Sequence, residues 1–320
     1  MVHGLASKPP EATTHELWRD TLIENIRVDN PDLASELSSL PIIFNSAYWA
    51  DCIPHHIPDD KPYCRNLKKQ VQNVIVERKE IGDEFHVGTG EAIGAFFKDR
   101  GLDLLKLMTG ALTIKDDVMK TFLRETELYD EDQYIADKIR LNLENSLRDA
   151  WDNNCEPIII SHSMGTFIAY DVLWRFSHRK SEGFKKYNSK RVKMFITMGS
   201  PLGDETVRNL LFSKHHQSKS SRRFPTNIDY WHNYSCAGDA VSHQKNFNCI
   251  FYTPMRNLKL FPQNKKFRTI DYTGLHNPFE VVGHKDNKGK EKRNPHKSYG
   301  YLAQPRLASW VSDYLLDNLK

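Results

Sequence analysis

The chain has 320 residues, of which 39% are hydrophobic and 27% are charged, and its net charge is +4. This balance is ordinary for a globular protein, and the length suits one large α/β domain or two smaller ones. The modest charge does not by itself indicate a nucleic-acid partner, and no run of about 18 apolar residues predicts a membrane-spanning helix.

The first residues, MVHGLASKPPE, have neither the basic start nor the apolar core of a secretory signal. Five cysteines are scattered along the chain without C-x-x-C spacing, namely Cys52, Cys64, Cys155, Cys236 and Cys249. This pattern favours reduced thiols and argues against a structural zinc site. We therefore expect a cytoplasmic protein without a cofactor, and we leave peripheral contact with a membrane open.

The short segment Val2-His3-Gly4-Leu5 predicts a strand end that opens into a loop. Free backbone N–H groups in such a loop can bind an oxyanion. Because only two residues precede His3, three readings stay open: a frayed terminus, a stunted strand, or a strand whose earlier residues are missing from this chain.

Residues 14–28 place apolar side chains at helical spacing, and the apolar run at residues 40–48 is typical of a strand. A strand, a helix and a second strand in succession predict a parallel sheet.

Residues 49–110 are the least regular part of the chain. Three prolines interrupt the beginning of this segment, and residues 93–107 then carry a strongly apolar helical pattern. We interpret the segment as a lid or cap inserted after the second strand.

The same segment contains His55-His56 close to Asp59-Asp60. Adjacent histidines rarely chelate one ion, and the chain has no helical H-x-x-x-H spacing. We therefore predict no metal site.

Residues 116–151 carry apolar side chains at intervals of about four, which predicts one long amphipathic helix that packs on the sheet. Asn153-Asn154 is expected to end it, and Pro157 to open the next strand.

Residues 157–170, PIIISHSMGTFIAY, are the most informative stretch of the chain. A β-branched run followed by S-H-S-M-G and a helix-like continuation predicts a buried strand, a sharp turn that carries a nucleophilic Ser163, and a helix. The backbone at such a serine is strained, so the residues two before and two after it must be small; here they are Ser161 and Gly165. The alternative is a strand followed by an ordinary serine N-cap.

Two more strands are expected at residues 192–198 and 228–234, and a last one at 267–273. Asp239 follows the second of these beside a glycine, where its carboxylate can lie over the sheet edge. The alternative is a turn aspartate that bonds its own backbone.

His296 precedes a final amphipathic stretch at residues 298–319, which Pro305 is expected to kink or restart. A histidine there can act as a general base at neutral pH. Its rivals are His243, His276 and His284.

Taken together, Val2 to Gly4, S-H-S-M-G, Asp239 and His296 resemble the α/β-hydrolase-fold serine hydrolases, and the strand exit ITMGSPL is similar to lipase-like members. The resemblance implies one domain over residues 1–320, with a mostly parallel central sheet, helices on both faces, and the first family strands lacking. Three features depart from the family pattern: Ser161 replaces a glycine, Thr166 stands where many lipases have another, and the strand before His3 is very short.

The resemblance also implies a catalytic triad of Ser163, Asp239 and His296, with Asp204 as a reserve acid. Backbone N–H groups of Met164 and Leu5 would form the oxyanion hole. The predicted activity is hydrolysis of an acyl ester of a lipid or a small molecule, and the alternative is a non-catalytic interaction or effector module that keeps the fold.

A basic cluster flanks His296. We favour a solvated loop here, and the sharper hypothesis is that these charges attract an anionic lipid surface. The cluster comprises Lys285, Lys288, Lys290, Lys292, Arg293 and Lys297. Nucleic-acid binding ranks low because the other basic stretches contain few aromatic residues and no recognisable module.

Overall fold

The computed structural model describes residues 1–4, 9–39, 44–53, 61–81, 117–216, 220–242, 247–261, 269–285 and 291–318. Within these ranges the fold is α/β, and its centre is a four-stranded parallel sheet in the order β1-β2-β3-β4. The strands are β1 (Ile158–His162), β2 (Val192–Met198), β3 (Ile228–Cys236) and β4 (Ile270–Leu275). The strands expected at residues 192–198 and 228–234 are therefore confirmed.

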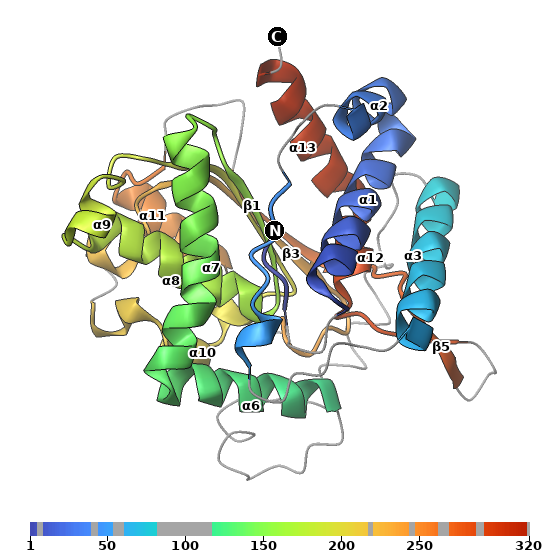
Figure 1. Ribbon diagram of the computed structural model, residues 1–320, viewed down its shortest axis with the longest axis horizontal. Helices are drawn as coiled ribbons and strands as arrows, with labels where there is room; N and C mark the ends of the chain where they lie inside the picture. Colours follow the sequence, from blue (N-terminus) through green and yellow to red (C-terminus); the bar gives the residue numbers. More distant parts are fainter. Residues whose placement is uncertain are drawn as a thin grey trace.

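Two layers of helices flank this sheet (Figure 1). One layer contains α6 (Asp117–Glu131), α7 (Gln133–Asp152), α8 (Met164–His178), α9 (Glu182–Lys185), α10 (Glu205–Arg208) and α11 (Thr253–Asn257). The other contains α1 (Glu11–Asp29), α2 (Pro31–Ser39), α3 (Lys61–Ile81), α12 (Ser298–Leu302) and α13 (Pro305–Asn318).

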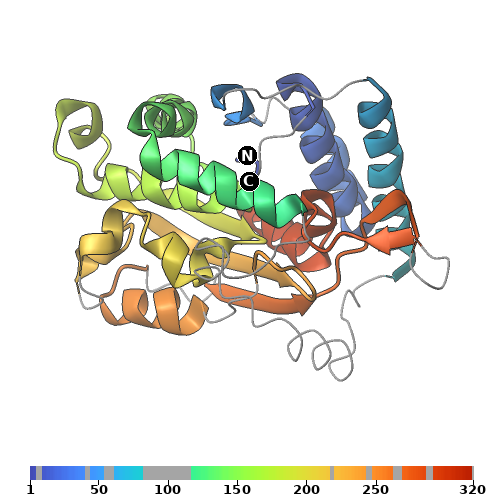
Figure 2. The ribbon, with the colours of Figure 1, turned by 90° about the horizontal axis from the view of Figure 1, so that it is seen from below.

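β1 and β2 carry apolar side chains on both faces because each face of the sheet has its own core. Ile159 and Phe195 pack with α7 and α8, whereas Ile160 and Ile196 pack with α1 and α13. Alternate residues of a strand point to opposite faces, so a continuous apolar run is what a strand between two helical layers requires. Figure 2 shows these layers from a second direction.

The first residues extend the sheet beyond β1. Val2 forms a parallel bridge with Ser161, in which the Val2 N–H donates to the Ile160 carbonyl at 2.8 Å and the His162 N–H donates to the Val2 carbonyl at 3.0 Å. Val2 therefore lies beside the strand that leads to Ser163, which agrees with the stunted strand among the three readings.

Residues 44–47 lie on the other side of Met1. The Met1 nitrogen donates to the Asn45 carbonyl at 2.6 Å, and the Ala47 N–H donates to the Met1 carbonyl at 2.8 Å, which is the donor pattern of a parallel ladder. No strand is assigned at residues 44–49, and residues 40–43 lie outside the described ranges. The chain thus passes from Val2 outward to residues 44–47 and returns to β1 on the opposite side.

The helix expected at residues 116–151 is wrong in one respect, because the structure has two helices there. Asp132 separates α6 from α7, and its carboxylate accepts the N–H groups of Tyr134 and Ile135 at 3.0 Å. This N-cap satisfies donors that a helix terminus leaves without partners, so a second helix can begin in the middle of an amphipathic pattern.

The C-terminal part differs from the expected loop around the basic cluster. Residues 280–285 and 291–293 pair as an antiparallel ribbon of β5 (Glu280–Lys285) and β6 (Glu291–Arg293). The restart predicted at Pro305 is confirmed, since α13 begins there.

Only part of the expected lid is described. Residues 61–81 form α3, whose Leu67, Val71 and Val74 share an apolar core with α1, and Figure 1 shows α3 lying outside α1. Residues 54–60 and 82–110, including the histidine and aspartate pairs and the helical pattern at 93–107, lie outside the described ranges.

Candidate active site

Ser163 lies at a sharp turn between β1 and α8. Its φ of 54° falls in the left-handed region that L-residues seldom occupy, and its N–H donates to the Met198 carbonyl at the end of β2 at 2.9 Å. The strain expected at this serine is therefore present, and a neighbouring strand holds the turn in place.

The two small residues near Ser163, Gly165 and Ser161, are accommodated in different ways. A Cβ atom on Gly165 would lie 2.4 Å from the His3 carbonyl oxygen, so the start of α8 touches the first residues of the chain directly. Ser161, which replaces the more usual glycine, donates its hydroxyl to the Ile196 carbonyl at 2.8 Å. The extra hydroxymethyl group is thus accommodated by a hydrogen bond to β2.

The structure brings Ser163 next to His296. His296 Nε2 is 2.9 Å from Ser163 Oγ, and His296 Nδ1 is 2.9 Å from both carboxylate oxygens of Asp239. Because a carboxylate can only accept, Nδ1 carries the proton and Nε2 is left to accept one from the serine. All three side chains are largely buried.

Asp239 lies a few residues after β3, as the sequence predicted, and hydrogen bonds fix its carboxylate. Its Oδ1 accepts the Val241 N–H at 2.9 Å, and its Oδ2 accepts the Tyr301 hydroxyl at 2.6 Å. Burial alone would raise the pKa of the Asp239 carboxyl, but His296 and these hydrogen bonds hold that pKa below its usual value. The Asp239 side chain that contacts His296 is therefore the ionised carboxylate.

Asp204 serves a different purpose in the described structure. Its carboxylate accepts the Thr206 N–H at 2.7 Å and caps α10. The acid that contacts His296 is Asp239.

Of the three rival histidines, His276 is the one whose side chain the structure describes. His276 lies beside Arg293 and Glu77, and burial together with the Arg293 charge lowers its pKa to about 4. The side chain of His284 and the whole of His243 lie outside what the structure describes.

Met164, one of the two expected oxyanion donors, is the first residue of α8. The N–H groups of a first helical turn have no acceptor within the helix, and they lie at its positive end. Leu5, the other expected donor, lies outside the described ranges. Gly4 precedes it and touches the site, since a Cβ atom there would lie 2.7 Å from the Ser163 Cβ.

His3 holds this N-terminal turn in place. The Trp49 backbone N–H donates to His3 Nε2 at 3.0 Å, and the Trp49 indole N–H donates to the His3 carbonyl at 2.9 Å. The two rings stack with centroids 4.7 Å apart. Because Nε2 accepts, Nδ1 carries the proton that bonds the Gly4 carbonyl at 2.7 Å.

Several residues that contact the catalytic candidates were not foreseen from the sequence. His162 Nε2 donates to the His296 carbonyl at 2.7 Å, and the Asn277 amide donates to the carbonyls of Pro295 and Lys297, each at 2.9 Å. Three consecutive carbonyls around His296 are thus held by two buried side chains. Of these residues, only His162 could have been recognised from the sequence, because it is part of the S-H-S-M-G motif.

The basic cluster is described in part. Lys288 and Lys290 lie outside the described ranges, as do the side chains of Lys285 and Lys292. Arg293 lies 3.4 Å from the Glu77 carboxylate, so an acidic residue of α3 partly offsets its charge.

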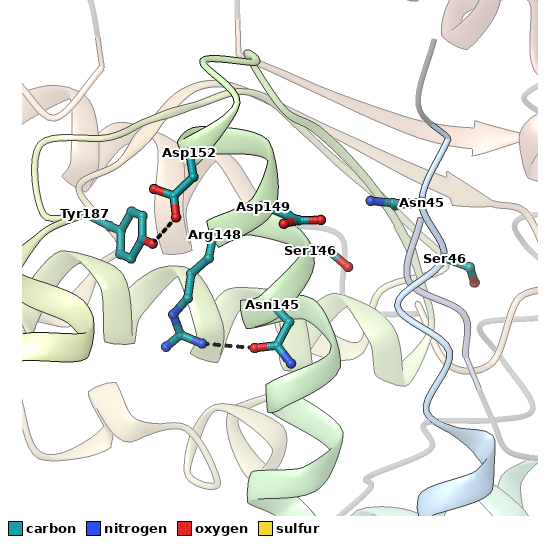
Figure 3. Close-up of a pocket in the computed structure, with 8 residues that line it drawn as sticks. All are labelled: Asn45, Ser46, Asn145, Ser146, Arg148, Asp149, Asp152 and Tyr187. Atoms are coloured by element: carbon teal, nitrogen blue, oxygen red, sulfur yellow. Dashed lines mark hydrogen bonds between the residues drawn. The ribbon is translucent and has the colours of Figure 1, made fainter. Parts of the chain in front are cut away.

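Three cavities lie elsewhere on the described surface. One of about 500 Å³ has a mostly apolar lining that includes Leu143, Ile158 and Val311. Two polar cavities, of about 460 and 380 Å³, lie beside α7, and Figure 3 shows the larger one with Asn145 and Arg148 among its lining residues. None of the three is lined by Ser163, His296 or Asp239.

Two further observations bear on the class of site. Within the residues that the structure describes, no cluster of three or more His, Cys, Asp or Glu side chains could hold a metal ion. No helix there is both long enough and apolar enough to cross a membrane.

The chain was compared with models of protein families, with curated proteins and with solved structures, and none of them matched.

Proposed function

We propose that this protein is a serine hydrolase of the α/β-hydrolase fold that cleaves acyl esters. The observation that carries the proposal is the chain of contacts from Ser163 Oγ through the His296 imidazole to the Asp239 carboxylate, each step 2.9 Å long. A serine at a strained turn, a base within hydrogen-bond reach and an acid that orients the base are the three parts of a nucleophilic triad.

The position of these residues in the sheet supports the same proposal. The strand order reverses between Val2 and β1, because the chain reaches residues 44–47 on one side of Val2 and β1 on the other. In open α/β sheets, ligands bind at such a reversal, beyond the carboxyl ends of the strands. Ser163 and Gly4 follow the two strands that diverge there.

The proposed reaction begins when His296 Nε2 takes the Ser163 proton and the Ser163 oxygen attacks the ester carbonyl carbon. Asp239 keeps the proton on Nδ1 and stabilises the imidazolium that forms. The Met164 N–H donates to the oxyanion of the tetrahedral intermediate; removing one such donor costs about 3–4 kcal/mol in known enzymes.

The intermediate collapses when the ester C–O bond breaks and the leaving alcohol takes the proton from His296. This leaves an acyl group on Ser163. Water, deprotonated by His296, then attacks the acyl carbonyl, and the serine is released together with the carboxylic acid.

We further propose that residues 49–110 cover the site as a lid and that the substrate is a lipid or a small-molecule ester. The full burial of Ser163 supports a covered site. The basic cluster around Arg293 and Lys297 is proposed to approach anionic lipid surfaces, each basic residue contributing about 1 kcal/mol. Equal binding to neutral and anionic vesicles would remove this part of the proposal.

The test is labelling by a fluorophosphonate, which reacts with activated serines. The wild-type protein should be labelled and should hydrolyse an activated acyl ester, and Ser163→Ala should do neither. Ser146→Ala, which removes a serine hydroxyl on α7 that bonds the Asn142 carbonyl, is the matched control and should remain reactive. An unlabelled wild-type protein would instead support a non-catalytic module with this fold.

A further inference from the structure

The Tyr301 side chain makes a short contact with the proposed catalytic acid. Tyr301 comes from α12, five residues after His296, and its hydroxyl oxygen is 2.6 Å from Asp239 Oδ2. Its side chain is 0% exposed. A buried phenol this close to a buried carboxylate makes a strong hydrogen bond to it. This bond changes the negative charge that the Asp239 carboxylate presents to His296.

The position of the phenol proton follows from a third group. The Cys236 backbone N–H donates to the Tyr301 oxygen at 3.0 Å, and an N–H can only donate. The Ser242 hydroxyl, 3.5 Å away, can donate as well as accept, whereas Asp239 Oδ2 at 2.6 Å can only accept, so the single hydroxyl proton goes to Asp239 Oδ2. Burial and the adjacent Asp239 charge raise the pKa of Tyr301 well above its usual value, so the hydroxyl keeps this proton.

We infer that Tyr301 is a positioning residue for the proposed reaction: it fixes the Asp239 carboxylate and draws negative charge away from the oxygens that face His296. This inference rests on the proposed function. Without the phenol proton, the carboxylate would hold the protonated imidazole more strongly, and His296 would remain protonated to a higher pH. Tyr301 thus weakens the attraction of the Asp239 carboxylate for the imidazolium that forms on His296.

Few other titratable groups face this pair in the described structure. The His162 ring lies 4.7 Å from the His296 ring and 5.8 Å from the Tyr301 ring. The Cys236 thiol lies at the end of β3, next to the backbone N–H that donates to Tyr301. Asp239 is the carboxylate that contacts Tyr301. Replacing Tyr301 by Phe alters one hydroxyl and leaves these groups in place.

The deciding experiment compares Tyr301→Phe with Tyr170→Phe. Tyr170 is an equally buried tyrosine of α8 whose hydroxyl donates to the Arg223 carbonyl, far from Asp239 in the chain. In Tyr301→Phe, the acid limb of the pH–rate profile should move to higher pH by about one unit or less, since one hydrogen bond is lost. KM should change less than twofold, and Tyr170→Phe should keep the wild-type profile.

A second measurement does not require activity. The pH midpoint of the His296 imidazole resonances, followed by NMR, should move upward in Tyr301→Phe. In an Asp239→Asn background, the same change should produce no such movement. Absence of labelling together with this movement would contradict the proposed function but not the effect of Tyr301 on Asp239 and His296.

Identical profiles and identical midpoints in wild type and Tyr301→Phe would overturn the inference. Any loss of stability would then mean that Tyr301 only fills the core.

Discussion

Gly165 lies against His3 so closely that a Cβ atom on Gly165 would be 2.4 Å from the His3 carbonyl oxygen and 2.6 Å from that of Val2. Both oxygens belong to the backbone beside β1, so a rotamer change cannot relieve the overlap. The first turn of α8, which begins next to Ser163, and the short N-terminal strand therefore fix each other's position.

We expect Gly165→Ala to lower the free energy of unfolding by about 1–3 kcal/mol, as overpacked sites do. It should also slow the labelling of Ser163, because α8 must shift away from Val2. Urea denaturation measures the first effect. Gly183→Ala is the control, since apart from its chain neighbours and its own helix backbone nothing lies within 4 Å of a Cβ there. Equal losses in the two variants would contradict the proposed contact.

The strained backbone of Ser163 predicts an unusual ranking of variants. Its φ is 54° and its ψ is −128°, a sparsely populated combination that costs a residue with a Cβ about 1–3 kcal/mol, whereas glycine adopts it readily. Ser163→Gly should therefore be more stable than Ser163→Ala by about 1 kcal/mol, and both should be inactive.

A serine inside a helix should show the opposite stability ranking of its glycine and alanine variants. Ser146 lies within α7, where glycine is about 1 kcal/mol less favourable than alanine. Ser146→Gly should therefore be less stable than Ser146→Ala. If thermal unfolding ranks alanine above glycine at both positions, the turn at Ser163 carries no strain.

The two candidate acids can be separated by their amide variants. Asp239→Asn keeps the shape of the side chain but favours the wrong tautomer of His296, so activity should fall about ten-thousandfold, as for the acid of a comparable triad. Asp204→Asn should keep nearly full activity, because asparagine also caps a helix well. Hydrolysis of an activated ester measures both, and a large loss in Asp204→Asn would assign the acid role to Asp204.

The parts of the fold that could be predicted are those in which local pattern and burial agree. The apolar run before Ser163 and the run at residues 192–198 are strands between two helical layers, so most of their residues are apolar on whichever face they lie. The chain order of Ser163, Asp239 and His296 was also readable, because each follows a strand or precedes a helix.

The missed elements had weak local signals. The break at Asp132 interrupts an amphipathic pattern that continues on both sides, and only its capping contacts reveal it. The β5–β6 ribbon is rich in charge and lacks the alternation that indicates a half-buried strand. The contacts of Tyr301 and Asn277 join segments that are separated in the chain, and no spacing predicts them.

Asn277 and Gly300 form a pair whose coupling can be measured. The Asn277 amide donates to the carbonyls on both sides of His296, and a Cβ atom on Gly300 would lie 1.7 Å from Asn277 Oδ1. Gly300→Ala should therefore displace the amide while leaving Asn277 in the sequence. Each single variant should lower kcat about tenfold with little change in KM, because His296 loses its fixed position and two carbonyls lose their donors.

The double variant decides whether the two residues act through one contact. In Asn277→Ala the space beside Gly300 is vacant, so adding Gly300→Ala should cost little more, and the double variant should resemble Asn277→Ala alone. Steady-state hydrolysis of an activated ester gives kcat for the two single variants and the double variant. If the two losses multiply to about a hundredfold, Asn277 and Gly300 act independently, and the glycine is required for the helix rather than for the amide that holds His296.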